Sequence, residues 1–530
     1  MQMYLPAING TISRHVISIL VILVFSLLMA RTLTPFGSAT TSDSLNYLDI
    51  AKNIKSGHGV LATDYSLENN HGQLYRDARL WPPLYPIALA VTSFNLPDVV
   101  TAARLSAVLL ALTAGFAYLL LAPAINWYFA LPASLFLCLT LPLITVYTFA
   151  WSETLFIPLL LATAWAAIRY LETESTVARG KYLYLGMLVV FLVALAYTRY
   201  IGIALVLLLP ATFLMSHGRR GSLTAFVVAA GVYAVAVGYL LVDNYLATGS
   251  IRGGVRLPSD RTLLENLHDA FSAVGVNIPS SSLVLLLILA AAVCLSLAYA
   301  LLERVRVQEQ PEPASHRNTR NILLLVGVVY LGALLALGMY SRFDRLDVRL
   351  LAPGLTVLWI LLLVLLVQLK PVNKRHLVPQ VLLWCCVIMF PVEGYTRLQA
   401  SIQNWWLLGG PNYPANGGVN YQNFTHTEQA RRIREMFAGL VAADAMIVTN
   451  RPRVFEFLSG IRSLQLPENI DLDVIYKFNA LPAGSLILLP NDTPQKGLLK
   501  LRLKHDISYE YIHLGQRIGI RTPIYVVPKG

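Results

Sequence analysis

The chain has 530 residues, of which 56% are hydrophobic and only 13% are charged. A soluble domain usually carries about 25% charged residues, so this composition excludes an ordinary soluble protein, and the mean hydropathy of +0.59 agrees with that exclusion. The net charge of +12 does not indicate nucleic-acid binding. Most lysines and arginines lie in short loops between apolar runs, as the positive-inside rule predicts for a membrane protein.

The apolar runs are about 17 to 22 residues long, enough to cross a hydrocarbon core of about 30 Å. They predict a polytopic α-helical membrane protein with about eleven spans. The first run lacks a small-residue cleavage site and is too long for a typical signal sequence, so we expect it to remain as a span. The predicted spans are residues 12–30, 101–122, 127–147, 153–170, 182–198, 200–215, 223–242, 281–302, 321–340, 348–369 and 377–396.

The charges of the loops predict the orientation. With a cytoplasmic N-terminus, the short basic loops lie inside, and the long loops 31–100 and 243–280 lie outside together with the C-terminal segment. We therefore expect a multi-pass protein of the cytoplasmic (inner) membrane, in contact with membrane lipids. It would consist of a transmembrane domain, 1–398, and a small extracytoplasmic α/β domain, 399–530. Glycines in the loop 243–280 suggest a mobile cover for a site.

A short amphipathic helix is predicted directly after the first span. Leu45, Leu48 and Ala51 recur at helical spacing, and Gly57 and Gly59 end the pattern. Such a helix is expected to lie along the membrane surface. Asp43 falls in its first turn, where the helix dipole favours the ionised carboxylate. Two interpretations remain open for Asp43, a catalytic carboxylate or a solvated residue that caps the helix.

A second carboxylate, Glu153, stands at the start of a predicted span with no basic residue nearby in the sequence. A charge in this position is costly unless it faces a polar cavity or has a partner. The alternative is an interfacial carboxylate that reaches water. Glu153 and Asp43 are predicted to lie on the same side of the membrane, where two carboxylates could perform general acid–base catalysis.

Several arginines lie on the outer side, against the positive-inside tendency. Arg199 and Arg349 border spans and lack an adjacent acid, whereas Arg342 and Arg345 share a short loop with two aspartates that could pair with them. Arginine suits phosphate because its planar fork donates two hydrogen bonds and stays charged. These arginines therefore suggest a lipid-phosphate headgroup as ligand.

From about Gly409 the sequence has the character of a soluble α/β segment. A helix is predicted to begin with a capping box at Thr425, and strands are predicted at 445–449, 485–489 and 524–527. No glycine-rich phosphate fingerprint connects these elements. Cysteines and histidines show no metal-ligand spacing, so we expect no cofactor and assign no metal ligand, and dependence on a divalent metal ion stays open.

Six loose motifs, in order along the chain, resemble those of the polytopic glycosyltransferases with the GT-C fold. The resemblance is to the bacterial branch that includes protein O-mannosyltransferases and the aminoarabinose transferase acting on lipid A, and it extends from about residue 12 to about residue 369. The motifs are Ser42-Asp43-Ser44, Pro82-Pro83-Leu84-Tyr85-Pro86, Ala103-Arg104-Leu105, Ser152-Glu153-Thr154, Thr198-Arg199-Tyr200 and Arg349-Leu350-Leu351.

The resemblance implies a reaction outside the cytoplasmic membrane. Such enzymes move a sugar from a polyprenyl-phosphate carrier to a lipid, glycan or protein acceptor, usually with inversion at the anomeric carbon. By position, Asp43 would accept the proton of the acceptor hydroxyl and Glu153 would be a second acidic group. Arg199 and Arg349 would hold the carrier phosphate.

The chain departs from these relatives in two places. Trp81 stands where a basic residue often precedes the proline motif, so that contact is either missing or supplied by Arg79 or Arg76, beside Tyr85 of the motif itself. Asp43 is followed by Ser44 instead of a second acid. Two other functions remain open, a polysaccharide polymerase or ligase with a large outer loop, and a transporter whose outer charges line a substrate route.

Overall fold

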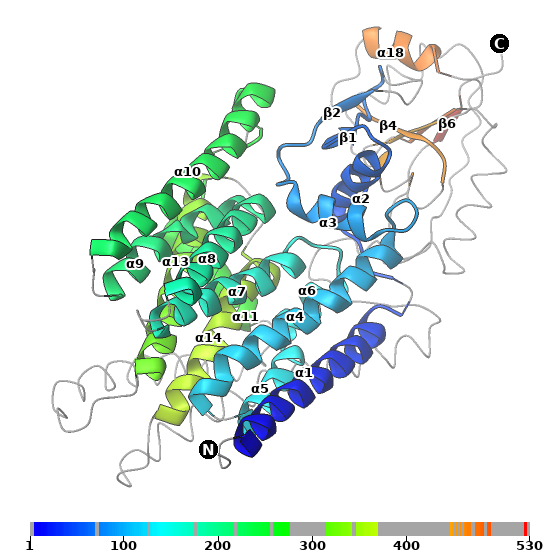
Figure 1. The fold of residues 1–530 in the computed structure, drawn as a ribbon. Coiled ribbons are helices and arrows are strands. Elements are labelled where there is room, and N and C mark those ends of the chain that lie inside the picture. Colours follow the sequence, from blue (N-terminus) through cyan, green and yellow to red (C-terminus); the bar gives the residue numbers. More distant parts are fainter. Residues whose placement is uncertain are drawn as a thin grey trace. The chain divides into compact units, whose positions relative to one another are not determined.

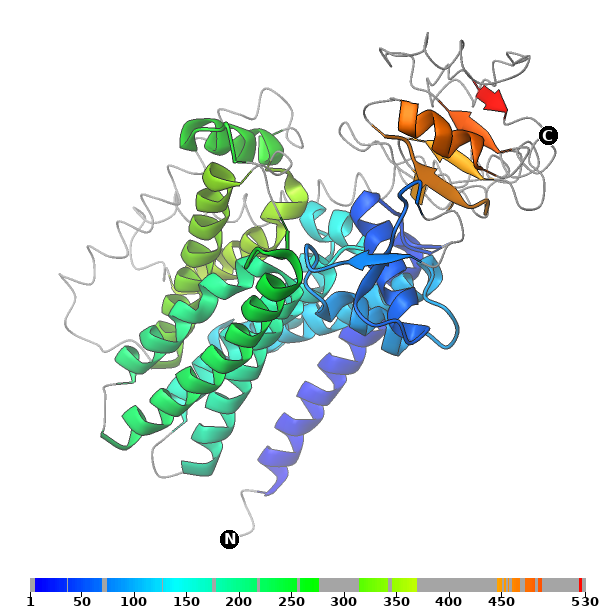
Figure 2. The same ribbon diagram turned by 90° about the horizontal axis from the view of Figure 1, so that it is seen from above.

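The computed structural model consists of two compact units (Figures 1 and 2). The first contains Met1–Gly37, Arg79–Thr92 and Val100–Gln403, and the second contains Ser38–Ala78, Ser93–Val99 and Asn404–Gly530. The residues that the structure describes are 5–35, 37–68, 74–125, 127–173, 178–216, 220–254, 258–275, 314–341, 346–368, 446–449, 452–453, 456, 460–467, 472–481, 485–488 and 524–526.

Within the described residues, seven helices are long and apolar enough to cross a membrane. A bent pair, α5 (Trp127–Cys138) and α6 (Leu141–Thr148), makes an angle of 56° and would form an eighth span. Pro142, in the first turn of α6, has no N–H to continue the hydrogen bonding of α5. The seven helices are α1 (Leu5–Leu33), α4 (Val99–Ile125), α7 (Glu153–Glu172), α8 (Ala178–Thr198), α10 (Arg220–Thr248), α13 (Ala314–Tyr340) and α14 (Val348–Gln368).

These helices confirm the prediction of a polytopic helical protein. The predicted span 127–147 is the bent pair, and the predicted spans 281–302 and 377–396 lie outside the described residues. The predicted span 200–215 is a 3-10 helix, η1 (Tyr200–Leu207), followed by the short helix α9 (Leu208–Met215). The remaining predicted spans correspond to the seven long helices.

Helix α7 lies at the centre of the first unit. It packs against α8, α13 and α14, and 72% of its apolar window is buried, the largest share among the candidate spans. Phe156, Leu160 and Ala164 are fully buried along it. Gly354 of α14 allows a close approach to α13, because a Cβ there would lie 2.6 Å from a Leu331 side-chain carbon. The first residue of α7, Glu153, is therefore held in a packed environment.

The second unit combines part of the first outer loop with the C-terminal segment. Helix α2 (Ser42–Lys55) packs on a hairpin of β1 (Leu61–Thr63) and β2 (Tyr75–Asp77). A four-stranded sheet has the order β4-β3-β5-β6, parallel except for β6. Its strands are β3 (Ile447–Thr449), β4 (Ser463–Gln465), β5 (Leu486–Leu488) and β6 (Ile524–Val526), and α18 (Leu472–Asn479) accompanies them.

The structure divides the chain differently from the sequence prediction, which placed loop 31–100 in the membrane domain. Leu67 lies in the same hydrophobic core as Val448, Phe478 and Ile487, and the Gln465 N–H donates to the carbonyl of Tyr65. Three predicted strands of the C-terminal segment are found, and β4 was not predicted. The helix predicted at 425–440 lies outside the described residues.

Candidate active site

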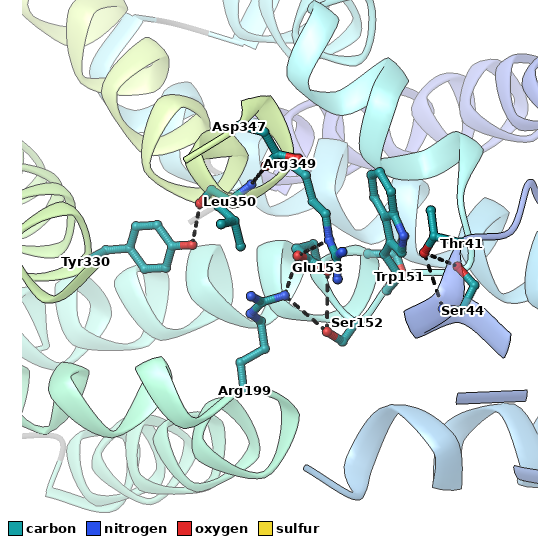
Figure 3. Close-up of polar contacts among 11 residues, drawn as sticks. Thr41, Ser44, Trp151, Ser152, Glu153, Arg199, Tyr330, Asp347, Arg349 and Leu350 are labelled. Atoms are coloured by element: carbon teal, nitrogen blue, oxygen red, sulfur yellow. Dashed lines mark hydrogen bonds and ion pairs between the residues drawn. The ribbon is translucent and has the colours of Figure 1, made fainter. Parts of the chain in front are cut away.

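Three charged side chains meet where helices of the first unit begin or end (Figure 3). Glu153 is fully buried at the start of α7. The Arg349 Nε donates a hydrogen bond of 2.6 Å to the Glu153 Oε1, and the Arg199 Nη1 forms an ion pair with the same oxygen. Arg199 follows the last residue of α8, and Arg349 lies in the first turn of α14. Three helix ends therefore bring these charges together.

The local backbone explains where Arg199 lies. Helix α8 ends at Thr198, and Arg199 is extended with φ −153°. Its carbonyl accepts the Gly202 N–H at 2.8 Å, which starts the 3-10 helix. A Cβ on Gly202 would lie 2.5 Å from the backbone carbon and oxygen of Leu195. Only glycine therefore allows the chain to turn this tightly against the end of α8.

Arg349 is positioned by the cap of its own helix. Asp347 Oδ1 accepts the Leu350 N–H at 3.0 Å, which satisfies an orphan donor at the helix start. The Tyr330 hydroxyl donates to the Leu350 carbonyl at 2.8 Å and joins α13 to this turn. The Arg349 guanidinium lies 4.5 Å from the centre of the Trp151 ring. The cation–π contact and the cap fix Arg349 from two sides.

Hydrogen bonds and ion pairs offset the buried charge of Glu153. The Ser152 hydroxyl donates to the Glu153 Oε2 at 3.4 Å and accepts from the Arg199 Nη1 at 3.3 Å. A buried carboxylate is costly without partners, and here two guanidinium groups and the start of a helix offset that cost. Two arginines and one glutamate leave this triad with one excess positive charge. The arginine side chains are 18% and 12% exposed, so both retain some contact with solvent.

This geometry adds one pairing and excludes one alternative. Arg199 and Arg349 have no adjacent acid in the sequence, but both pair with Glu153 in space. Glu153 does not reach water as an interfacial carboxylate, because its exposed fraction is 0%. Asp347, one of the two aspartates of the arginine-rich loop, caps α14. Arg342 and Arg345 lie outside the described residues.

Asp43 occupies the first turn of α2, as predicted from the helical pattern. The N-cap is Thr41, whose hydroxyl accepts the Ser44 N–H at 3.4 Å, so Asp43 is not the N-cap residue of this helix. Its side chain is half-buried. Gly57 and Gly59 have φ +84° beyond the end of α2, a conformation that glycine adopts readily. Asp43 belongs to the second unit, and its place beside Glu153 stays a prediction.

Arg79 and Tyr85 lie in the first unit. The Arg79 guanidinium makes two contacts with Asp243 of α10, at 2.9 and 3.4 Å, and the Tyr200 hydroxyl donates to the Arg79 carbonyl. Tyr85 is fully buried in the first turn of α3 (Leu84–Thr92). The structure thus gives Arg79 a carboxylate partner within the chain, and a role for either residue toward substrate stays a prediction.

Sequence reasoning did not identify Trp151, Ser152 and Tyr330 as parts of the site. Trp151 and Ser152 directly precede Glu153, and an aromatic residue next to a buried acid was the available signal. Tyr330 shows no such signal in the sequence, because this residue lies within an apolar span. Among the described residues, no group of three or more His, Cys, Asp or Glu side chains could hold a metal ion.

The part of loop 243–280 that the structure describes contains α11 (Leu263–Gly275). Two contacts join this loop to the end of α13, from the Ser259 hydroxyl to the Gly338 carbonyl and from the Arg252 guanidinium to the Ser341 hydroxyl, both at 2.7 Å. Motion of this loop over a site stays a prediction.

Similar structures identify the fold. No protein-family model and no curated protein sequence matches the chain. The structure is similar to that of ArnT from Cupriavidus metallidurans. The apo state of that protein gives a TM-score of 0.58 at 12% identity, and the match covers 99% of this chain and 100% of that chain. With undecaprenyl phosphate bound, the same protein gives a TM-score of 0.53 at 10% identity, covering 98% and 99%. An oligosaccharyltransferase from Archaeoglobus fulgidus gives 0.43 at 12% identity, covering 84% and 62%.

The likeness to ArnT, a lipid A aminoarabinose transferase, extends over nearly the full length of both chains. It confirms the predicted GT-C fold and a multi-pass membrane protein.

Proposed function

We propose that this chain is a membrane glycosyltransferase that moves a sugar from a polyprenyl-phosphate carrier to an acceptor. The observation that carries the proposal is the pairing of Arg199 and Arg349 on the buried Glu153, at adjoining helix ends. The GT-C fold supports it, because the ArnT structure of the same fold holds undecaprenyl phosphate. The acceptor is a lipid, a glycan or a protein.

In the proposed reaction the carrier phosphate leaves with negative charge. Prepositioned arginines stabilise the charge that develops on it in the transition state. Glu153 fixes the direction of both guanidinium groups without cancelling their combined charge. The anomeric carbon becomes electron-poor, as in other glycosyl chemistry, and the transfer inverts its configuration.

Asp43 is the proposed general base, which accepts the proton of the acceptor hydroxyl. The helix dipole favours the charged form of a carboxylate in the first turn of a helix. Glu153 already accepts from two arginines, so it is better suited to hold them than to take a proton. The two carboxylates therefore have different roles.

We place the reaction at the outer face of the cytoplasmic membrane, with the N-terminus inside. Short basic loops mark the inner side. Glu153, Arg199 and Arg349 belong to the opposite helix ends, consistent with a carrier phosphate at the outer interface. The same observation disfavours a transporter, in which charged residues usually lie at mid-depth in the membrane. A polysaccharide polymerase or ligase would use the same arginines on a longer glycan.

The experiment compares wild-type protein with Asp43→Asn, each given a panel of polyprenyl-phosphate sugars and a membrane extract as acceptor. The measurement is release of polyprenyl phosphate. We expect wild type to release it and Asp43→Asn to be at least about 100-fold slower, as for loss of a general base. The variant should still bind the donor.

The matched control is Asp473→Asn, the same chemical change at a carboxylate whose side chain is 71% exposed. It should retain wild-type turnover. Equal release by wild type and Asp43→Asn would remove Asp43 from the mechanism. Release only when a growing glycan is the donor would favour the polymerase or ligase.

A further inference from the structure

Arg453 of the second unit is a half-buried cation with unused hydrogen-bond donors. Its guanidinium lies over the Tyr65 ring at 5.0 Å and hydrogen bonds the Tyr65 side chain. Its Nε and Nη2 are buried and have no hydrogen-bond partner among the residues that the structure describes. These two N–H groups lie along one edge of the guanidinium, and that edge binds phosphate or carboxylate with two parallel hydrogen bonds.

The surroundings of Arg453 disfavour a cation without a ligand. Burial lowers the pKa of Arg453, and the nearby Arg76 on β2 lowers it further. Asp49 and Tyr65 act in the opposite direction. The two oxygens of Asp49 already accept the Thr63 N–H at 2.8 Å and the Thr63 hydroxyl at 2.6 Å. A buried donor left without a partner costs free energy, so the site would be stabilised by an anion.

The position of Arg453 connects the two sequence segments of the second unit. Tyr65 and Arg76 come from the first outer loop, and Arg453 follows β3 in the C-terminal segment. Tyr65 is itself held by the Gln465 N–H at its carbonyl. The Tyr65 ring therefore packs on the Arg453 guanidinium, and Arg76 is near enough to act on its charge.

We infer that Arg453 and Arg76 form a second anion site, which binds a phosphate group with two of its oxygens on the Nε and Nη2 of Arg453. Two cations suit a phosphate monoester better than a single carboxylate, because the monoester carries nearly two negative charges at pH 7. The phosphate could be free or borne by a lipid headgroup. The inference does not depend on the proposed transferase activity.

The test uses full-length protein in phosphatidylcholine nanodiscs. The unfolding temperature is measured against inorganic phosphate, with sodium chloride matched for ionic strength. We expect a saturable rise for wild type and at least a tenfold weaker apparent affinity for Arg453→Gln. Arg453→Lys should also lose most of the affinity, since lysine keeps the charge but has no planar fork.

Two further variants separate this site from the rest of the chain. Lys477→Gln removes a charge from an exposed ion pair of the same unit and should respond as wild type does. Arg349→Gln should also keep the Arg453-dependent response, whatever the outcome for transferase activity. If Arg453→Gln does not fold, the exposed Arg76 offers a second route, and Arg76→Gln should weaken phosphate binding several-fold.

A second arm identifies the source of the phosphate. Phosphatidic acid replaces part of the phosphatidylcholine, and wild type is again compared with Arg453→Gln. A difference between them with phosphatidic acid alone would assign a lipid-borne phosphate, and a difference with inorganic phosphate would show that the free group suffices. Equal responses of the two proteins in both arms, or no response in either, would overturn the inference.

Discussion

Glu153 accepts from two guanidinium groups on a single oxygen, which suggests a positioning residue instead of a base. Glu153→Gln keeps the shape of the side chain and removes its charge. Breaking a buried ion pair from one side costs about 3–5 kcal/mol. The two arginines are partly exposed, so we expect a loss of about 3 kcal/mol in stability. The uncompensated arginines should then hold polyprenyl phosphate several-fold more tightly, and turnover should fall about tenfold or more.

The readout for Glu153→Gln is the inhibition constant of polyprenyl phosphate, measured together with turnover. A general base would lower turnover and leave the affinity for this product unchanged, which would contradict the positioning role. Glu172→Gln is the matched control, because it breaks the Arg169–Glu172 pair of 3.0 Å at the other end of α7. That pair is partly exposed and should contribute at most about 1 kcal/mol.

At the residue scale, the sequence identified the three charges but not their pairing. Glu153, Arg199 and Arg349 stand out because each is charged at the border of an apolar run. Sequence separation hides their contact, since Arg349 lies 196 residues from Glu153. Tyr330 is not found by the same reasoning, because aromatic residues are common in spans and at their ends.

At the element scale, the segment Tyr200–Met215 shows how a 3-10 helix lengthens a short apolar segment. The 3-10 helix η1 has 8 residues and covers roughly 16 Å at its rise of about 2.0 Å per residue. Helix α9 adds 8 residues and roughly 12 Å. Together they approach the hydrocarbon thickness of about 30 Å. Hydropathy predicted an apolar segment here, but its helix type depends on the contact of Gly202 with α8.

We therefore expect Gly202→Ala to displace η1 and, with it, Arg199. A new Cβ would meet the Leu195 backbone at 2.5 Å, and backbone cannot move aside as a flexible side chain can. Overpacking of this kind costs about 1–3 kcal/mol. Turnover should fall by more than tenfold, and donor binding should weaken because Arg199 is a proposed phosphate ligand.

Gly186→Ala is the matched control for this prediction. Gly186 lies inside α8, and nothing lies within 4 Å of a Cβ built there. Alanine favours a helix over glycine by about 0.8–1.0 kcal/mol, so this variant should be slightly more stable and fully active. Equal behaviour of the two variants, measured by thermal unfolding and donor turnover, would contradict the role of the close contact at Gly202.

At the scale of the whole molecule, composition and hydropathy predicted the class of protein and most of its spans. They did not predict that part of the first outer loop shares a core with the C-terminal segment. Leu67 and Phe478 lie in one hydrophobic cluster, and no local pattern reports a contact across so much sequence. Short strands such as β4, with 3 residues, also give too little periodicity to be recognised.

The last prediction follows from the proposed orientation of the whole molecule in the membrane. In a cysteine-free background, Ser250→Cys after α10 and Lys477→Cys in the second unit should react with a membrane-impermeant thiol reagent in intact cells. Lys181→Cys, near the start of α8, should react only after permeabilisation. The reason is that α8 and α10 end on the side of Arg199, while the basic loops before them lie inside. Labelling of Lys181→Cys in intact cells, with Ser250→Cys protected, would invert the topology. The proposed carrier phosphate would then meet Arg199 and Arg349 at the cytoplasmic face, and an outer-face transferase would be excluded.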